Sequence, residues 1–87
     1  MIVEVIALSS NASKQTKSSH PFSAVLEIIP VGTAAVNAVI SADETQPQES
    51  CDWYVLQAGG QLPGMAGFAG KAQLGSGRFY IFSTCIG

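Results

Sequence analysis

Apolar residues occur along this chain in short runs that are rich in β-branched side chains and are separated by polar or glycine-containing segments. Such runs are typical of strands, because branched and aromatic side chains pack well on a pleated surface. The pattern predicts five strands, of which the last, beginning at Arg78, is the clearest. These strands cover residues 2–8, 22–29, 34–41, 52–58 and 78–86.

Two of these runs depend on how their side chains alternate. The run at 34–41 contains alanines that permit a helix, but its β-branched residues and short length favour a strand with Val36 and Ile40 on one face. In the run at 22–29, strict alternation predicts one face that carries Phe22, Ala24, Leu26 and Ile28.

Two segments between the predicted strands have the composition of loops. Residues 9–20 form the longest polar stretch, and residues 59–77 are rich in glycine, which leaves the backbone free to bend. Five short strands with turn signals between them, and no long helix, predict one all-β domain that spans residues 1–87. We expect a small antiparallel five-stranded barrel or sandwich, a group that includes OB-like folds.

Composition narrows the class of protein. Of 87 residues, 47% are hydrophobic and 11% are charged, against a usual charged share of about 25%. This balance excludes a charged disordered tail. Four basic residues against six acidic ones argue against a strongly nucleic-acid-binding surface. A net charge of −2 repels other copies only weakly, so we expect a surface that packs against protein.

The sequence also bears on the compartment. No apolar run approaches the roughly 18 residues of a membrane span, and no charged start with an apolar core indicates secretion. We therefore expect no membrane partner and a place in a virion or the cytoplasm. In such a compartment Cys51 and Cys85 are expected to be reduced, buried thiols. A disulfide between them is the alternative, and would add roughly 3 kcal/mol of stability.

No arrangement of residues indicates catalysis, a cofactor or a metal. His20 is the only histidine and lies in a serine-rich segment, but no nucleophile-elbow motif or second base accompanies it. The glycine-rich run that ends at Lys71 lacks the spacing of a phosphate-binding loop, because Ala72 follows the lysine. We expect a protein that is not an enzyme and has no cofactor and no metal site.

Aromatic pairs and the glycine-rich loop provide candidate contact residues. Adjacent rings on a strand point to opposite faces, so one ring of each pair can fill the core while the other meets solvent, a partner chain or a stacked base. Apolar side chains on the glycine-rich loop can dock into the protein's own core or into a neighbour. The candidate protein-interface residues are Leu62, Met65, Phe68, Trp53 and Tyr80.

Short segments of the chain resemble the single-stranded-DNA-binding (helix-destabilising) proteins of filamentous phages. They are the opening MIVEV, HPFS at 20–23, DETQP at 43–47 with Tyr54 beyond it, a glycine-flanked Phe68, and Arg78. The resemblance implies a five-stranded barrel of the OB type that acts as a dimer and coats phage DNA. It also implies that Phe22 and Phe68 stack on bases, and that Lys17 and Arg78 contact phosphates. The family's surface is basic, whereas this chain is net acidic.

Three functions follow from these observations. The first is a non-enzymatic, self-associating structural protein, as in a viral shell or decoration layer, whose partners are other copies or a larger protein assembly. The alternative is a phage-type protein that binds single-stranded DNA. The third is a small inhibitor of a host factor, whose acidic edge would consist of Asp43, Glu44, Glu49 and Asp52.

Overall fold

The computed structural model describes residues 1–75 and 77–86, which form seven strands and no helix. None of these residues therefore belongs to a helix that could cross a membrane. The strands are β1 (Ile2–Ser9), β2 (Lys14–Ser19), β3 (Phe22–Val31), β4 (Ala35–Ala42), β5 (Glu49–Leu56), β6 (Gly67–Leu74) and β7 (Gly77–Ser83).

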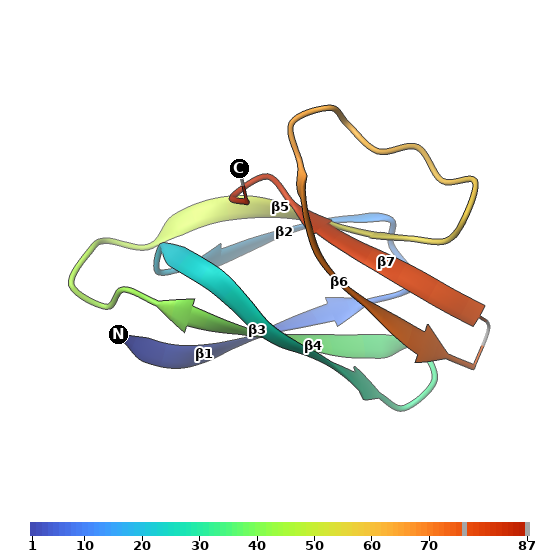
Figure 1. Ribbon diagram of the computed structural model, residues 1–87, viewed down its shortest axis with the longest axis horizontal. Helices are drawn as coiled ribbons and strands as arrows, with labels where there is room; N and C mark the ends of the chain where they lie inside the picture. Colours follow the sequence, from blue (N-terminus) through green and yellow to red (C-terminus); the bar gives the residue numbers. More distant parts are fainter. Residues whose placement is uncertain (76, 87) are drawn as a thin grey trace.

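The strands form two antiparallel sheets, one with the order β1-β4-β3 and one with the order β2-β5-β7-β6 (Figure 1). The prediction of an all-β fold is confirmed. Of the predicted antiparallel five-stranded barrel or sandwich, the antiparallel pairing is confirmed, but the number of strands is wrong, because seven are present. The barrel alternative is also wrong, because no ladder joins one sheet to the other. Both sheets contribute side chains to a single core, so the outer face of each sheet points away from the other.

The core is built from the side of each strand that faces the opposite sheet. Its fully buried centre includes Trp53 of β5, Ile40 of β4 and Ile81 of β7. The central strand β4 alternates strictly between half-buried and buried positions along all eight residues. This alternation confirms the strand predicted over 34–41, because a helix would bury residues with a period of 3.6 instead of 2.

Two β-bulges change which side chains of β3 face the core. They lie between Phe22 and Ala24 and between Val25 and Glu27, and each inserts one residue relative to β4. The residues packed against the core are therefore Phe22, Val25 and Ile28, at intervals of three. The prediction that Ala24 and Leu26 share one face with Phe22 and Ile28 is therefore wrong, and both residues are exposed.

Two strands lie within the segments predicted as loops. β2 occupies part of the polar segment 9–20, and β6 occupies part of the glycine-rich segment 59–77. Both are edge strands that pair on one side only, β2 with β5 and β6 with β7. Edge strands tolerate polar and small residues because less of their surface is buried. The polar and glycine-rich composition of these two segments therefore gave no sign of a strand.

Cys51 and Cys85 are joined by a disulfide, so the expectation of reduced thiols is wrong. The reason is the register of β5 and β7, which sets Trp53 opposite Ser83. Two steps further along this antiparallel ladder, Cys51 lies opposite Cys85, and their Cα atoms are 5.6 Å apart. This is within the usual range for a disulfide. The bond holds the segment after β7 against β5.

Candidate functional site

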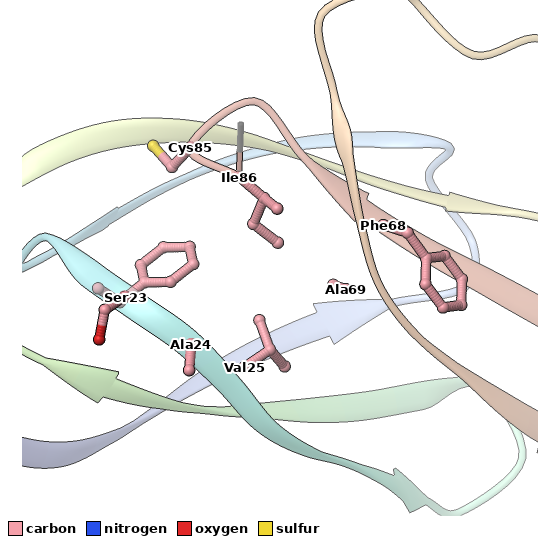
Figure 2. A pocket seen from close by; sticks show the side chains of 8 residues that line it. Ser23, Ala24, Val25, Phe68, Ala69, Cys85 and Ile86 are labelled. Atoms are coloured by element: carbon pink, nitrogen blue, oxygen red, sulfur yellow. The ribbon is translucent and has the colours of Figure 1, made fainter.

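A pocket of about 310 Å³ lies where the two sheets meet, between β3, β6 and the segment after β7 (Figure 2). None of its lining residues carries a charged side chain. They are Phe22, Ser23, Ala24, Val25, Phe68, Ala69, Cys85 and Ile86. The structure thus brings together Phe22 and Phe68, the two residues that the phage-protein resemblance assigned to base stacking.

The pocket has a local structural cause. β3 and β6 are the edge strands of their sheets, and both carry a bulge beside the pocket, at Phe22/Ala24 and at Phe68/Gly70. A bulge bends its strand and takes backbone groups out of the ladder. The disulfide then fixes Cys85, and Ile86 after it, as a third wall. Ile86 packs so closely on Gly67 that a Cβ at position 67 would clash with it.

The two aromatic residues of the pocket differ in how firmly they are held. Phe22 is half-buried and stacks on the fully buried Trp53, with ring centroids 5.7 Å apart and an interplanar angle of 21°. Phe68 is 57% exposed and meets Phe82 edge-on, at 5.5 Å and 66°. Phe22 is therefore a fixed ring, whereas Phe68 offers most of its surface to a ligand.

Phe68 also belongs to a row of rings on the outer face of the four-stranded sheet. The register places Tyr54 opposite Phe82, and Phe82 opposite Phe68. Tyr80 lies on the same face, two residues before Phe82. We call this surface the aromatic face. Tyr54 is buried, the rings of Tyr80 and Phe82 are half-buried, and Phe68 is the most exposed of the four.

Three of the four basic residues of the chain lie on the aromatic face. Lys14 is opposite Tyr54, Lys71 is opposite Tyr80, and Arg78 lies two residues before Tyr80. All three are exposed. The carboxylate on the described part of this face is that of Asp52, which lies 3.7 Å from the Lys14 ammonium and accepts a hydrogen bond from the Thr16 hydroxyl. Three positive charges against one negative charge leave a local excess of two.

The fourth basic residue, Lys17, lies apart from this group. It is opposite Cys51 in the β2–β5 ladder, which places it on the opposite side of β2 from Lys14. It is half-buried there. Of the four residues that the resemblance implied for nucleic acid, the structure therefore brings Phe68 and Arg78 to the aromatic face and Phe22 to the adjoining pocket, but not Lys17.

The acidic residues lie mostly elsewhere. Asp43 and Glu44 form the turn between β4 and β5. Hydrogen bonds donated by the hydroxyl and backbone N–H of Thr45 lower the pKa of Asp43. A backbone hydrogen bond and then the Met1 ammonium, 3.0 Å away, lower the pKa of Glu44. Glu4 and Glu27 belong to strands of the other sheet. The charges are therefore segregated, although their sum is negative.

The candidate protein-interface residues are not equivalent. Met65 is 85% exposed and Leu62 is 39% exposed, both in the glycine-rich segment before β6. Phe68 and Tyr80 lie on the aromatic face. Trp53 is fully buried and cannot contribute to a surface, so the expectation for this residue is wrong. Tyr54, which follows Trp53 in the sequence, carries the ring on the outer side of β5.

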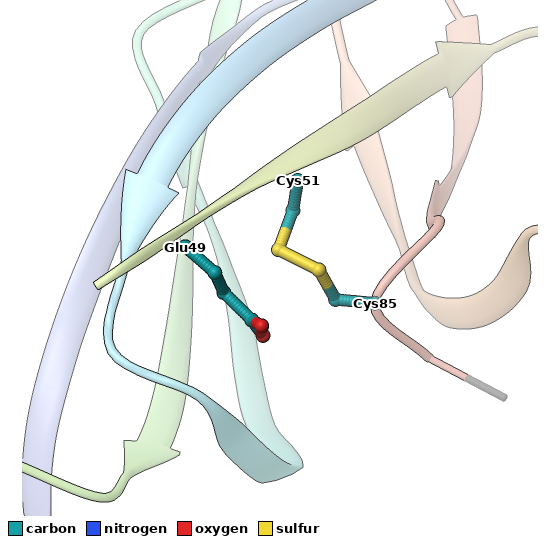
Figure 3. A group of neighbouring side chains, drawn as sticks. All are labelled: Glu49, Cys51 and Cys85. Carbon is teal, nitrogen blue, oxygen red and sulfur yellow. A yellow bond between two sulfur atoms is a disulfide. The ribbon is translucent and has the colours of Figure 1, made fainter. Parts of the chain in front are cut away.

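A carboxylate oxygen of Glu49 and the Sγ atoms of Cys51 and Cys85 all lie within 4.8 Å of one another (Figure 3). This group does not make a metal site, because both sulfur atoms are used in the disulfide and offer no thiolate. What remains is a single exposed carboxylate.

Sequence reasoning missed three residues that the structure exposes fully or partly on the aromatic face: Lys14, Lys71 and Phe82. These residues come together only through the pairing of β2 with β5 and of β6 with β7, and both β2 and β6 lie in segments predicted as loops. A period-two pattern that includes Phe68, Lys71 and Gln73 is interrupted by the bulge at Phe68/Gly70.

No family model, curated protein or solved structure matches this chain.

Proposed function

We propose that the protein binds single-stranded nucleic acid without catalysing a reaction on it. The observation that carries the proposal is the coincidence of three partly exposed aromatic rings, Phe68, Tyr80 and Phe82, with three of the four cations on one sheet face. Single-strand binders combine rings on which bases stack with cations that track the backbone. The net acidic composition is no obstacle, because the acids lie mostly away from this face.

The pocket beside the aromatic face adds a second type of contact. Bases stacked on Phe68 would lie next to a recess of about 310 Å³ whose lining includes Phe22. Edge-strand backbone groups at the bulges can form hydrogen bonds with the edge of a base, since no ladder joins β3 to β6. Nucleic-acid binding on a sheet face is also the mode of OB-type folds, although the two sheets of this chain do not close into the barrel of those folds.

The test is the binding of a fluorescently labelled oligo-dT, followed by anisotropy at several salt concentrations. Three cations that face a single strand predict a slope of log affinity against log salt of roughly −2. Phe68→Ala is expected to weaken binding by roughly five- to a hundredfold, because it removes a stacking ring. Lys71→Gln is expected to make the slope less steep.

The matched control is Lys17→Gln, which removes the same charge from the other side of β2. It should leave both affinity and slope close to those of the unmodified protein. The absence of binding at low salt, or equal effects of the Lys17 and Lys71 substitutions, would contradict the proposal.

A self-associating structural protein is the second candidate. It is favoured by exposed apolar side chains at two separate places, Leu62 and Met65 on the glycine-rich segment, and Val3 and Val5 on the outside of β1. Two different contacts on each copy are what an extended array requires. Native mass spectrometry over a range of concentrations should detect species larger than 9.0 kDa. A monomer at every concentration would exclude this candidate.

A further inference from the structure

The outer face of the three-stranded sheet is apolar and exposed. The ladders set Val3 opposite Ser41, Val5 opposite Val39, Ala7 opposite Asn37 and Ser9 opposite Ala35, and β3 continues these rows with Ala24, Glu27, Ile29 and Val31. We call this surface the apolar face. Val3 is 67% exposed, Val5 56% and Val31 45%.

In a single copy, exposing the apolar side chains of this face to water brings no gain in stability that would explain them. An antiparallel sheet that is open to water on one side usually alternates apolar side chains inward with polar side chains outward. Here β1 and β3 carry branched apolar side chains on both sides. Near-continuous apolar strands are typical of sheets that are covered on both faces. The composition of these strands therefore indicates a partner on the apolar face.

The charge of the apolar face narrows the kind of partner. Glu27 is the charged residue in its rows, and it lies on the edge strand β3, where it can stay solvated at the rim of a contact. A nucleic acid or a strongly charged peptide would find no complementary charges here. A second copy presents the same apolar rows with Glu27 at the rim, and a two-fold contact matches this surface with itself.

The size of the apolar face fits a reversible contact. Three strands of about eight residues cover roughly 14 Å by 26 Å, or about 360 Å² per copy before the relief of the side chains is counted. Stable protein complexes bury about 800 Å² per partner. A pair held by this face alone should therefore form and separate with concentration.

We propose that two copies pack back to back through their apolar faces about a two-fold axis. This proposal deepens the second candidate function by naming its contact, and it does not depend on nucleic-acid binding. The two sheets share one core, so the aromatic face of each copy points away from the contact and stays accessible.

The experiment is analytical ultracentrifugation of the full chain over a range of concentrations. Val5→Glu places one charge per copy in the contact, and we expect it to raise the dimer dissociation constant at least tenfold. Val3→Glu, at the more exposed neighbouring position, should act in the same way. Met65→Glu is the matched control, because it makes the same change in charge at an 85% exposed residue outside the apolar face. Circular dichroism of each variant confirms that it is folded.

The outcomes are distinct. Dissociation caused by the β1 variants but not by Met65→Glu supports the back-to-back pair. A dimer that survives both folded β1 variants overturns this contact and leaves self-association intact. Loss of the dimer in Met65→Glu alone also overturns it and assigns the contact to the glycine-rich segment. A wild-type chain that is monomeric throughout overturns both this proposal and the second candidate function.

Discussion

At the scale of the residue, Gly70 shows how closely the two sheets approach at their meeting edges. A Cβ built on Gly70 would lie 2.5 Å from Cγ1 of Ile28, a side chain that packs against the core. This distance is shorter than any real contact between such atoms, and the clashing atom is not the free end of a flexible side chain. Position 70 therefore needs glycine for space beside β3.

Gly70→Ala is expected to destabilise the protein by about 1–3 kcal/mol, because the added methyl overpacks the junction of β6 with β3. Gly64→Ala is the control, since a Cβ there meets nothing within 4 Å. It should change the free energy of unfolding by less than about 1 kcal/mol. Urea denaturation of both variants measures the difference. Equal effects would show that the two sheets do not approach in this way.

At the scale of the element, the two bulges of β3 decide which of its side chains support the core. Alternation in the sequence groups Leu26 with Ile28, whereas the structure separates them. Leu26 is 55% exposed, and Ile28 packs against the core. The bulges thus convert a period of two into intervals of three along this strand.

Leu26→Ser is therefore expected to change the free energy of unfolding by no more than about 0.5 kcal/mol, as other exposed substitutions do. Ile28→Ser should cost about 2 kcal/mol or more, because it removes apolar surface from the core and introduces a hydroxyl. Thermal denaturation of the two variants decides between the arrangements. A large loss of stability for Leu26→Ser would place that side chain inside.

Some strands of this fold could be predicted from the sequence, whereas others could not. Strands whose buried side chains come from apolar runs, such as β4 and β7, were recognisable because both burial and alternation are local properties. β2 was not, because its side chains are polar and it pairs with β5 through backbone groups, which leave no apolar pattern in the sequence. The grouping of Phe68 with Lys71 and Arg78 could not be predicted, because it depends on pairing and on a bulge that no local pattern records.

At the scale of the whole molecule, the disulfide connects β5 to the last segment of the chain. It closes a loop with a sequence separation of 34 residues. By loop entropy, such a cross-link contributes about 3–4 kcal/mol to the free energy of unfolding. For a domain of this size that is a large share of a total of roughly 5 kcal/mol.

Reduction with a dithiol is therefore expected to lower the unfolding midpoint in urea substantially. It should also weaken oligo-dT binding, because Cys85 and Ile86 form one wall of the pocket. The variant Cys51→Ala with Cys85→Ala should behave like the reduced protein and should no longer respond to the reductant. Unchanged stability after complete reduction would show that the cross-link constrains nothing.

The aromatic face carries an excess of positive charge although the chain as a whole is acidic, so the isoelectric point alone does not describe how the protein interacts with charged surfaces. At pH 7 a chain with an isoelectric point near 5.0 should pass through a negatively charged chromatography resin. A resin, however, interacts mainly with the charges on the side of the protein that faces it, because at moderate salt electrostatic interactions are screened beyond about 10 Å. When the aromatic face approaches a negatively charged resin, its excess of positive charge determines the interaction. The protein should therefore be retarded on phosphocellulose and on an anion exchanger alike, each resin holding it by a different side.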